Sequence, residues 1–428
     1  MTMHPEENRA TPSPGRVVLF YHFFHPDDVV SARLFSDLAR ELSARGWQVT
    51  AHTSNRLWHD PNQRIEPASE VWEGVHIIRT SRFGLEQGGY FLRLLNAIWM
   101  MFGWTWRVLR TPKPDIFLIG TDPQFSQLLF PLLKLVAPRT RIAWWCFDLY
   151  PEAIAADQPG SLLAGMAMMT RHLIGPLYRL IDLVVDIGPC MRHRLHAYTQ
   201  RGKPITLTPW ALVEPLEMDR PDPAVRTRLF GENCRLGLLY SGSMGRAHDF
   251  ELFLELMRRL RYTHPEIRLA FACRGNRLAA LQAAVTPDDT NIAFAPFASE
   301  AELAQRLAAA DIHLLSLRPD WDGIVVPSKF FGSLATGRPL LYAGSEKSAI
   351  GQWIQDFDVG LRVDPQQIDQ VASRLQDMAR HPELLHHWQR NAFAVYQQHF
   401  SRQVILNGWN AALLDLLANP AAMTARTR

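Results

Sequence analysis

The segment Asp322–Glu346, DGIVVPSKFFGSLATGRPLLYAGSE, predicts a tight loop, a short helix and a buried strand, in that order. Pro327 suits the first turn of a helix, because its missing N–H group would have no hydrogen-bond partner there. Gly337 is a favourable residue for ending that helix, and the apolar run Leu340–Ala343 predicts the strand that follows. The segment therefore predicts part of an α/β domain.

Ser328 and Lys329 stand at the start of this predicted helix. The free backbone N–H groups and the dipole of a helix N-terminus attract anions, and a lysine adds a formal positive charge. The segment therefore also predicts an anion-binding site.

A second segment, Leu238–Phe250 (LLYSGSMGRAHDF), predicts a strand, a glycine-containing loop and the start of a helix. Gly242 and Gly245 would let the backbone approach a phosphate closely, and Arg246 adds a cation. His248 and Asp249 are more typical of residues at a helix N-terminus, where Asp favours the dipole, and contact between His248 and the phosphates is the alternative. Each segment alone is equally well explained by turn glycines and surface charges, but the two together favour a phosphate site.

These two segments resemble the donor-binding loops of retaining glycosyltransferases of family 4, and the first carries the VPSK variant of the motif. The resemblance extends more weakly over residues 16 to 410. It implies the GT-B fold, in which two Rossmann-like α/β domains face each other across a cleft and C-terminal helices cross back to the first domain. It implies a nucleotide diphosphate sugar as the donor, and Lys329 and Arg246 as the groups that stabilise the leaving diphosphate. The donor-binding residues would be Gly242, Ser243, Gly245, Arg246, Pro327, Ser328 and Lys329.

The sequence departs from the common pattern of that family at Gly332. Many relatives carry a glutamate there, and the register is fixed by the following Ser333–Pro339. Asp320 or Asp322 is a candidate replacement for an earlier glutamate of the pattern, and Glu346 is a candidate ribose-binding carboxylate. The departure concerns the identity of the donor more than the class of reaction.

Length and composition predict a globular protein with two domains. A chain of 428 residues is long for one core, and its content of 47% hydrophobic and 20% charged residues is typical of a folded protein. Strands and helices alternate in both halves, as in parallel α/β sheets. The predicted divisions are a disordered tail (1–15), an acceptor-side domain (16–208), a proline-rich linker (209–234), a nucleotide-sugar domain (235–385), crossover helices (386–418) and a tail (419–428).

Candidate acceptor-side residues lie at the end of the first predicted strand, Arg16–Phe24, and in the loop after it. His22, His25 and Asp27 stand where the resemblance puts an acceptor-side loop, although a lone histidine at such a place is more often structural.

A further candidate pair lies in Trp144–Glu152 (WWCFDLYPE), which resembles the D-x-x-P-E segment of the same subfamily. Because the segment ends a strand, we expect Asp148 and Glu152 to face the cleft, with Asp148 as a catalytic residue that positions the acceptor hydroxyl. The alternative is that Asp148 caps the next helix.

The segment Tyr90–Leu109 is almost entirely apolar and rich in tryptophan. Arg93 and Asn96 interrupt it, and the remaining apolar run is short for a membrane span. It predicts an interfacial helix with Trp at the membrane boundary and Arg at lipid phosphates. Leu162–Ile181 is similar. The alternative is a helix buried on the sheet, but the lipid-linked acceptors common in the resembled family favour peripheral membrane contact.

Charge and cysteine content exclude other classes. A net charge of +3 is too small to indicate a nucleic-acid partner. The four cysteines are widely spaced, which predicts a reducing compartment and no zinc site. We expect no metal and no cofactor apart from the substrate, and a cytoplasmic location, since the polar N-terminus is not typical of a signal peptide.

The sequence therefore predicts a retaining glycosyltransferase, of hexosyltransferase type, in envelope or exopolysaccharide biosynthesis, with a glycan or lipid-linked acceptor. Three alternatives stay open: a GT-B sugar-nucleotide epimerase, a non-catalytic nucleotide-binding scaffold, and a dinucleotide-dependent oxidoreductase. The last is disfavoured because no G-x-G-x-x-G follows the first predicted strand.

Overall fold

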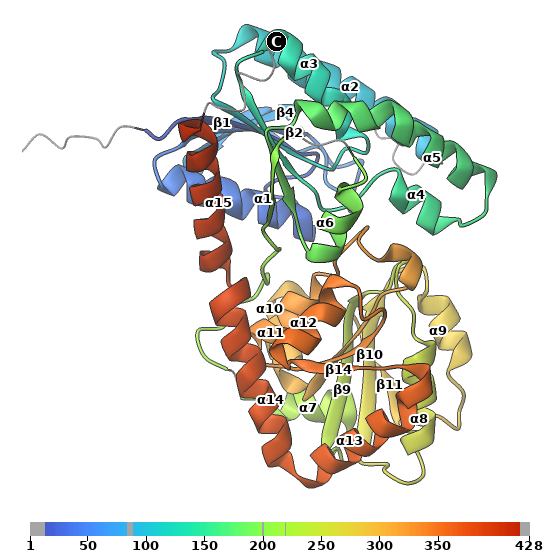
Figure 1. Ribbon diagram of the computed structural model, residues 1–428. Helices are drawn as coiled ribbons and strands as arrows, with labels where there is room; N and C mark the ends of the chain where they lie inside the picture. The colour runs from blue at the N-terminus through green and yellow to red at the C-terminus, as the bar shows by residue number, and fades with distance from the viewer. Residues whose placement is uncertain (1–12, 84–88, 199–200, 219, 420–428) are drawn as a thin grey trace, which may run out of the picture.

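The computed structural model describes residues 13–83, 89–198, 201–218 and 220–419. They form two α/β domains, and the C-terminal helices run along one side of both (Figure 1). Each domain contains a mainly parallel sheet covered by helices, so the fold class predicted from the alternation of strands and helices is confirmed.

The first domain is built on an eight-stranded sheet in the order β3-β4-β2-β1-β5-β6-β7-β8. Neighbouring strands are parallel except for the edge pair of β3 and β4. Strands β5, β6 and β7 are buried along their whole length, which explains their continuous apolar runs. The strands are β1 Arg16–Phe20, β2 Gln48–Ser54, β3 Ser69–Trp72, β4 Val75–Thr80, β5 Ile116–Gly120, β6 Arg141–Trp145, β7 Leu183–Asp186 and β8 Lys203–Thr206.

Helix α1 lies on one face of this sheet, and α2, α3 and α5 lie together on the other (Figure 1). The apolar spacing that predicted α1 is explained by burial, because Leu34, Phe35, Leu38 and Leu42 are all inside. The helices are α1 Val30–Ala44, α2 Gly89–Arg110, α3 Leu129–Val136, α4 Glu152–Asp157, α5 Leu162–Ile174 and α6 Pro189–Leu195, with short 3-10 helices η1 Ser126–Leu128 and η2 Gly175–Leu180.

The second domain has a six-stranded sheet in the order β11-β10-β9-β12-β13-β14, and every pair in it is parallel. Its strands are β9 Leu236–Ser243, β10 Ile267–Arg274, β11 Ile292–Phe294, β12 Ile312–Ser316, β13 Leu340–Ala343 and β14 Gly360–Arg362. Its helices are α7 Pro223–Phe230, α8 Glu251–Leu260, α9 Leu278–Ala284, α10 Glu300–Ala309, η3 Pro319–Trp321, α11 Lys329–Ala335, α12 Ala349–Phe357, η4 Pro365–Gln367 and α13 Ile368–Arg380.

The chain passes between the domains twice. Helix α14 (Pro382–Val395) packs on α11 and α13, a π-helical turn η5 (Tyr396–Phe400) follows, and α15 (Arg402–Ala418) packs on α1 of the first domain. The hydroxyl of Tyr396, in the second crossing, accepts a hydrogen bond of 2.9 Å from the backbone of Ala211, in the first. The same hydroxyl donates to the carboxylate of Glu214, which also accepts from the backbone N–H of Arg402.

Aromatic packing fixes α15 to the first domain. The Trp409 ring lies 4.7 Å from that of Trp145, and the indole N–H of Trp47 donates to Asn410 at 2.9 Å. The C-terminal helices therefore cross back to the first domain.

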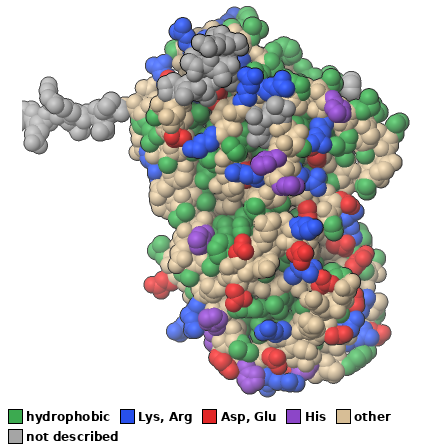
Figure 2. Space-filling model, viewed as in Figure 1, with side chains coloured by type: hydrophobic (Ala, Val, Ile, Leu, Met, Phe, Trp, Pro, Cys, Tyr) green, Lys and Arg blue, Asp and Glu red, His purple; other side chains and the backbone are tan. Residues whose placement is uncertain are grey.

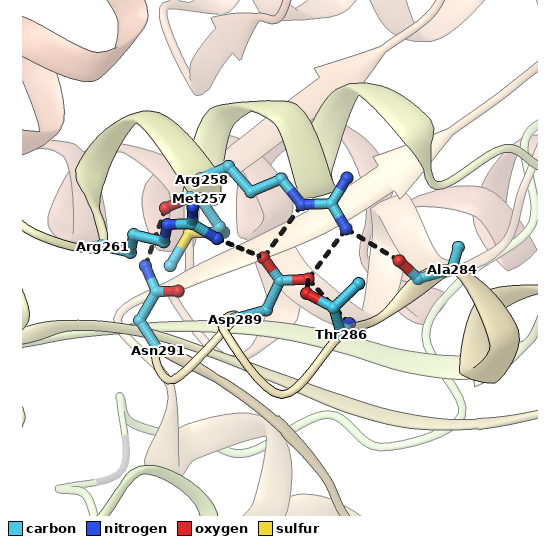
Figure 3. Close-up of polar contacts among 7 residues, drawn as sticks. All are labelled: Met257, Arg258, Arg261, Ala284, Thr286, Asp289 and Asn291. Atoms are coloured by element: carbon cyan, nitrogen blue, oxygen red, sulfur yellow. Dashed lines mark hydrogen bonds and ion pairs between the residues drawn. The ribbon is translucent and has the colours of Figure 1, made fainter.

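An ionic network around the carboxylate of Asp289 joins α8 to the segment before β11 (Figure 3). Asp289 is buried and accepts two hydrogen bonds from Arg258, at 2.9 and 2.8 Å, and one from Arg261 at 3.3 Å. The backbone N–H and the hydroxyl of Thr286 donate to the same carboxylate. These donors, Arg258 foremost, hold the pKa of Asp289 well below its usual value.

The structure differs from the sequence prediction in two local respects. Strand β1 ends at Phe20 rather than Phe24, because the next four residues form a buried loop in which the Tyr21 ring stacks 4.0 Å from Phe35. The segment predicted as a linker contains α7, whose Val225 and Leu229 pack in a core cluster of the second domain.

Helix α2 is buried on one side and exposed on the other. Met100, Met101 and Trp104 pack in the core, while an exposed stripe is formed by Leu95, Trp99, Phe102, Trp106 and Leu109. Asn96, which interrupts the apolar run, is buried: its side-chain oxygen accepts from the backbone N–H of Phe83 and its NH2 group donates to the carbonyl oxygen of Phe83. In the described part of the chain, no helix combines the length and the apolar character that a membrane span requires.

Candidate active site

The two loops singled out from the sequence meet at one cavity between the domains. It has a volume of about 780 Å³ and is lined by residues that follow β9 and β12, at the carboxyl ends of the parallel strands. This is where ligands bind in open α/β sheets. Of the predicted donor-binding residues it brings together Gly242, Ser243, Gly245, Arg246, Pro327, Ser328 and Lys329.

Lys329 and Gly242 are packed against each other. Gly242 has a φ of +117°, a backbone conformation that favours glycine, and a Cβ there would lie 2.8 Å from Cε of Lys329. Lys329 begins α11, and its Nζ donates to the carbonyl oxygen of Ser243 at 2.7 Å. The glycine therefore makes room for the lysine side chain, which ties one loop to the other.

His248 also contacts the ammonium group of Lys329. Its Nδ1 donates to the carbonyl oxygen of Ser316 at 2.5 Å, so its Nε2 is the acceptor that faces Nζ of Lys329 at 3.2 Å. Burial, and next the charge of Lys329, lowers the pKa of His248 to about 3, so this imidazole is neutral. Burial also lowers the pKa of Lys329 to about 8. With two N–H donors of the ammonium engaged in this way, the third is available to an anion.

Arg246 lines the same cavity but is paired across the domain interface. Its guanidinium forms an ion pair with the carboxylate of Asp157, at the end of α4 in the first domain. Half of the Arg246 side chain is exposed, whereas Asp157 is mostly buried. Arg246, which was predicted to bind phosphate, is thus paired with a carboxylate in this structure.

The position of the missing glutamate, Gly332, lines the cavity and is open. A Cβ at Gly332 would have its nearest neighbour at 3.8 Å, on Leu307. None of the proposed replacements fills the role, because Asp320, Asp322 and Glu346 are not among the described residues that line the cavity. Glu346 is exposed, beyond the end of β13, and its role in binding ribose stays a prediction. The carboxylate that does line the cavity, Asp28, comes from the first domain.

A second, smaller cavity of about 380 Å³ lies in the first domain. It brings together His22, Asp122, Asp148 and Tyr150. Burial, and next the charge of Asp122, raises the pKa of Asp148 to about 7. A carboxyl group that changes protonation near neutral pH can donate or accept a hydrogen bond there.

His22 is oriented by two charged neighbours. Its Nε2 accepts from Nη1 of Arg82 at 2.8 Å, and its Nδ1 lies 3.5 Å from the carboxylate of Asp122. Burial lowers its pKa, so the ring is the neutral Nδ1–H tautomer. Since both nitrogens are engaged, His22 shapes this cavity rather than serving as a base.

Three predicted acceptor-side residues do not line either cavity. His25 stacks on Trp72 at 4.2 Å, next to the edge strand of the sheet. Asp27 is buried and accepts from the backbone N–H groups of Val29 and Trp58, as a loop-forming aspartate does. Glu152 is also buried, and it accepts from the hydroxyl of Tyr198 at 2.6 Å instead of facing the cleft.

Sequence reasoning missed Asp122 and Arg274. Asp122 follows β5 closely, and Arg274 ends β10, where its guanidinium lies 4.2 Å over the ring of Phe297 on the wall of the larger cavity. In each case the carboxyl end of a predicted strand was the available signal.

No protein-family model matches the chain. Its sequence is 24% identical over 320 residues to the probable glycosyltransferase WbjE of Pseudomonas aeruginosa, which covers 72% of this chain and 76% of that protein.

Two solved structures resemble the chain over nearly their whole length. The sucrose-phosphate synthase of Thermosynechococcus elongatus has a TM-score of 0.70 at 16% identity, over 94% of this chain and 99% of that chain. The HepE protein of Anabaena, in a complex with UDP-glucose, has a TM-score of 0.60 at 12% identity, over 93% and 99%. The chain therefore has the GT-B fold, and the curated protein that it resembles in sequence is a probable glycosyltransferase.

Proposed function

We propose that this protein, a glycosyltransferase by fold and by relationship, transfers a sugar from a nucleotide diphosphate sugar with retention of configuration. The observation that carries the proposal is the shared cavity, in which the Gly242 loop and the start of α11 converge on the Lys329 ammonium. HepE, one of the structural neighbours, binds UDP-glucose and UDP. The acceptor that we propose is a glycan or a lipid-linked sugar.

In the proposed reaction the acceptor hydroxyl attacks the anomeric carbon from the face that the diphosphate leaves. The bond from that carbon to the phosphate oxygen breaks, the new glycosidic bond forms, and the hydroxyl proton passes to the leaving phosphate oxygen. Negative charge on the diphosphate grows during this step. Lys329 and the N–H groups at the start of α11 would stabilise that charge. Asp148 would hydrogen-bond the acceptor.

The test is a thermal-shift screen against UDP, GDP, dTDP and ADP, with and without EDTA. A ligand that binds only the folded state stabilises it by about 2.7 kcal/mol at a hundred times its Kd, so the cognate nucleotide should raise the Tm by several degrees. We expect one base to do so, with no effect of EDTA. No shift with any of the four at millimolar concentration would contradict the proposal and favour a scaffold.

Asp157→Asn should tighten the binding of that nucleotide. The carboxylate competes with the diphosphate for Arg246, and a partly exposed pair of this kind contributes about 0.2–1 kcal/mol, so the Kd should fall by a factor of roughly 1.4 to 5. Isothermal titration calorimetry measures this, with the exposed Asp356→Asn as the control. An unchanged or weaker affinity would show that Arg246 stays with Asp157 when the donor binds.

We further propose that the protein works in the cytoplasm, at the membrane surface, in envelope or exopolysaccharide synthesis. All four cysteines are free thiols, and α2 presents an exposed stripe that contains Trp99 and Trp106. Trp99→Ala with Trp106→Ala should reduce sedimentation with phosphatidylcholine vesicles. Tyr262→Ala, an exposed aromatic of the second domain, is the control. Equal sedimentation of all three proteins would rule the membrane contact out.

A further inference from the structure

A third cavity lies on the first domain, outside the candidate active site. It has a volume of about 530 Å³ and forms where α5 ends and the chain turns into η2. Arg171, His172 and Arg179 line it, together with Tyr198. We call it the Arg179 pocket.

The Arg179 pocket presents positive charge. Arg171 is fixed at its wall, because its guanidinium lies 5.0 Å over the Tyr198 ring and its Nε is 3.9 Å from the carboxylate of the buried Glu152. That carboxylate offsets one positive charge. His172 and Arg179 are exposed and have no protein partner among the residues that the structure describes. The pocket therefore has a fixed guanidinium and two cationic or hydrogen-bonding groups open to a ligand.

Apolar side chains border this pocket on the same helix. Leu162, Met166, Met169 and Leu173 are exposed by 83, 57, 71 and 76%. Their spacing along α5 puts them in one stripe, while Ala164, Ala167 and Ile174 form the buried side of the helix. We call the four residues the α5 stripe, and Met169 belongs both to it and to the pocket lining.

Helix α5, which carries the α5 stripe, lies on the same side of the sheet as α2 (Figure 1), and α2 also has exposed apolar side chains. Over the first domain, on the face shown in Figure 2, Lys and Arg side chains stand among hydrophobic ones and few acidic side chains are visible. A pocket with guanidinium groups next to an apolar stripe matches a ligand that is itself divided into a phosphate and a hydrocarbon part. Arginine binds phosphate oxygens in a bidentate way, and apolar helix faces insert among acyl chains.

We propose that the Arg179 pocket binds the phosphate headgroup of an anionic phospholipid while the α5 stripe lies among the acyl chains. The proposal rests on the membrane contact proposed above and is independent of the sugar-transfer chemistry. It adds a selective step to that contact, because α2 offers apolar area to any bilayer whereas the pocket recognises the charged headgroup.

The experiment is sedimentation of the full chain with phosphatidylcholine vesicles, with and without phosphatidylglycerol. A basic residue near an anionic surface contributes about 1 kcal/mol, so Arg179→Gln should weaken binding to the mixed vesicles about fivefold, and the double variant with His172→Gln should weaken it further. Binding to phosphatidylcholine alone should not change. The α2 variants Trp99→Ala and Trp106→Ala, in contrast, should lose binding to both kinds of vesicle.

Two controls separate a pocket from a diffuse basic surface. Arg374→Gln removes an exposed arginine from the second domain, and Arg139→Gln removes one from the first domain, between α3 and β6. An effect of Arg139→Gln equal to that of Arg179→Gln would overturn the pocket, and so would a double variant that behaves like Arg374→Gln. Displacement by inorganic phosphate at constant ionic strength, without any vesicle preference, would identify a site for free phosphate and overturn the lipid assignment. Nucleotide-induced thermal shifts should stay normal in the pocket variants, so a failure here is distinguishable from a failure of the proposed transferase function.

Discussion

Lys329→Met should lower kcat by about a hundredfold while the nucleotide still binds. Removing one preorganised donor from a site of developing negative charge costs roughly 10²–10³ in turnover. The buried ammonium is held by Ser243 and His248, so no reorganisation is needed when the diphosphate leaves. The measurement is turnover at saturating donor, with Lys347→Met, which replaces an exposed lysine, as the control. Turnover within about threefold of the wild type would contradict the role given to Lys329.

The pH profile supplies a second readout for the same residue. Burial lowers the pKa of Lys329 to about 8, so the charged form is lost as the pH rises through that value. The kcat/KM of the wild type, which reports the free enzyme, should therefore fall above about pH 8. This limb should be absent in Lys329→Met. If Lys329 were purely structural, the wild type would show no fall in kcat/KM near pH 8, or Lys329→Met would show the same fall as the wild type.

Asp289→Ala should destabilise the second domain by about 1–2 kcal/mol, because it removes the buried carboxylate that accepts from Thr286 and Arg258. The effect stays in this range because the Arg258 side chain is 39% exposed and its charge is screened by solvent. For a domain of this size that corresponds to a fall in Tm of roughly 2 to 8 °C. Asp369→Ala removes the exposed partner of Arg259 and is the matched control, with no expected change in Tm, since solvent screens an exposed pair. Calorimetry of the purified variants measures both. Equal melting of Asp289→Ala and the control would mean that the network adds nothing to stability.

The effect of Asp289 also has a predicted pH dependence. The carboxylate has a pKa held well below its usual value, chiefly by Arg258, so it binds its proton less readily in the folded state than in the unfolded state. Its stabilising contribution is therefore fully present above the unfolded pKa of about 3.9 and is lost as the pH falls toward the folded value. The difference in Tm between the wild type and Asp289→Ala should shrink in that acidic range.

The fold was predictable because its signals are local. Glycine and proline mark the ends of helices, and the buried strands β5, β6 and β13 appear as short apolar runs in the sequence. Apolar runs say less about where a strand stops. Phe20 and Phe24 belong to one aromatic run, but only Phe20 lies in β1. Phe24 is buried in the loop that follows, and a buried loop contains the same apolar residues as a buried strand.

The donor side of the site was predictable for a similar reason. Gly242 and Lys329 each belong to a short motif that sets its own backbone, and the carboxyl ends of parallel strands bring the two motifs together. The contacts that tune the site were not predictable. His248 accepts from Lys329, and Arg246 pairs with Asp157. Both contacts depend on side-chain directions that are set by the packing of segments far apart in the sequence. The direction of the Glu152 side chain was not predictable for the same reason, because it is set by the hydrogen bond from the Tyr198 hydroxyl.

The bridge through Tyr396 has a mechanical consequence. Two chain crossings that were independent of each other would let the domains both bend and slide. Here the hydroxyl of Tyr396 and the carboxylate of Glu214 lock the first crossing to the second. The pair then acts as one pivot, and backbone torsions at both crossings must change together. A rotation of the domains about these tied crossings would keep the hydrogen bonds of Tyr396, whereas a slide of one domain past the other would break them.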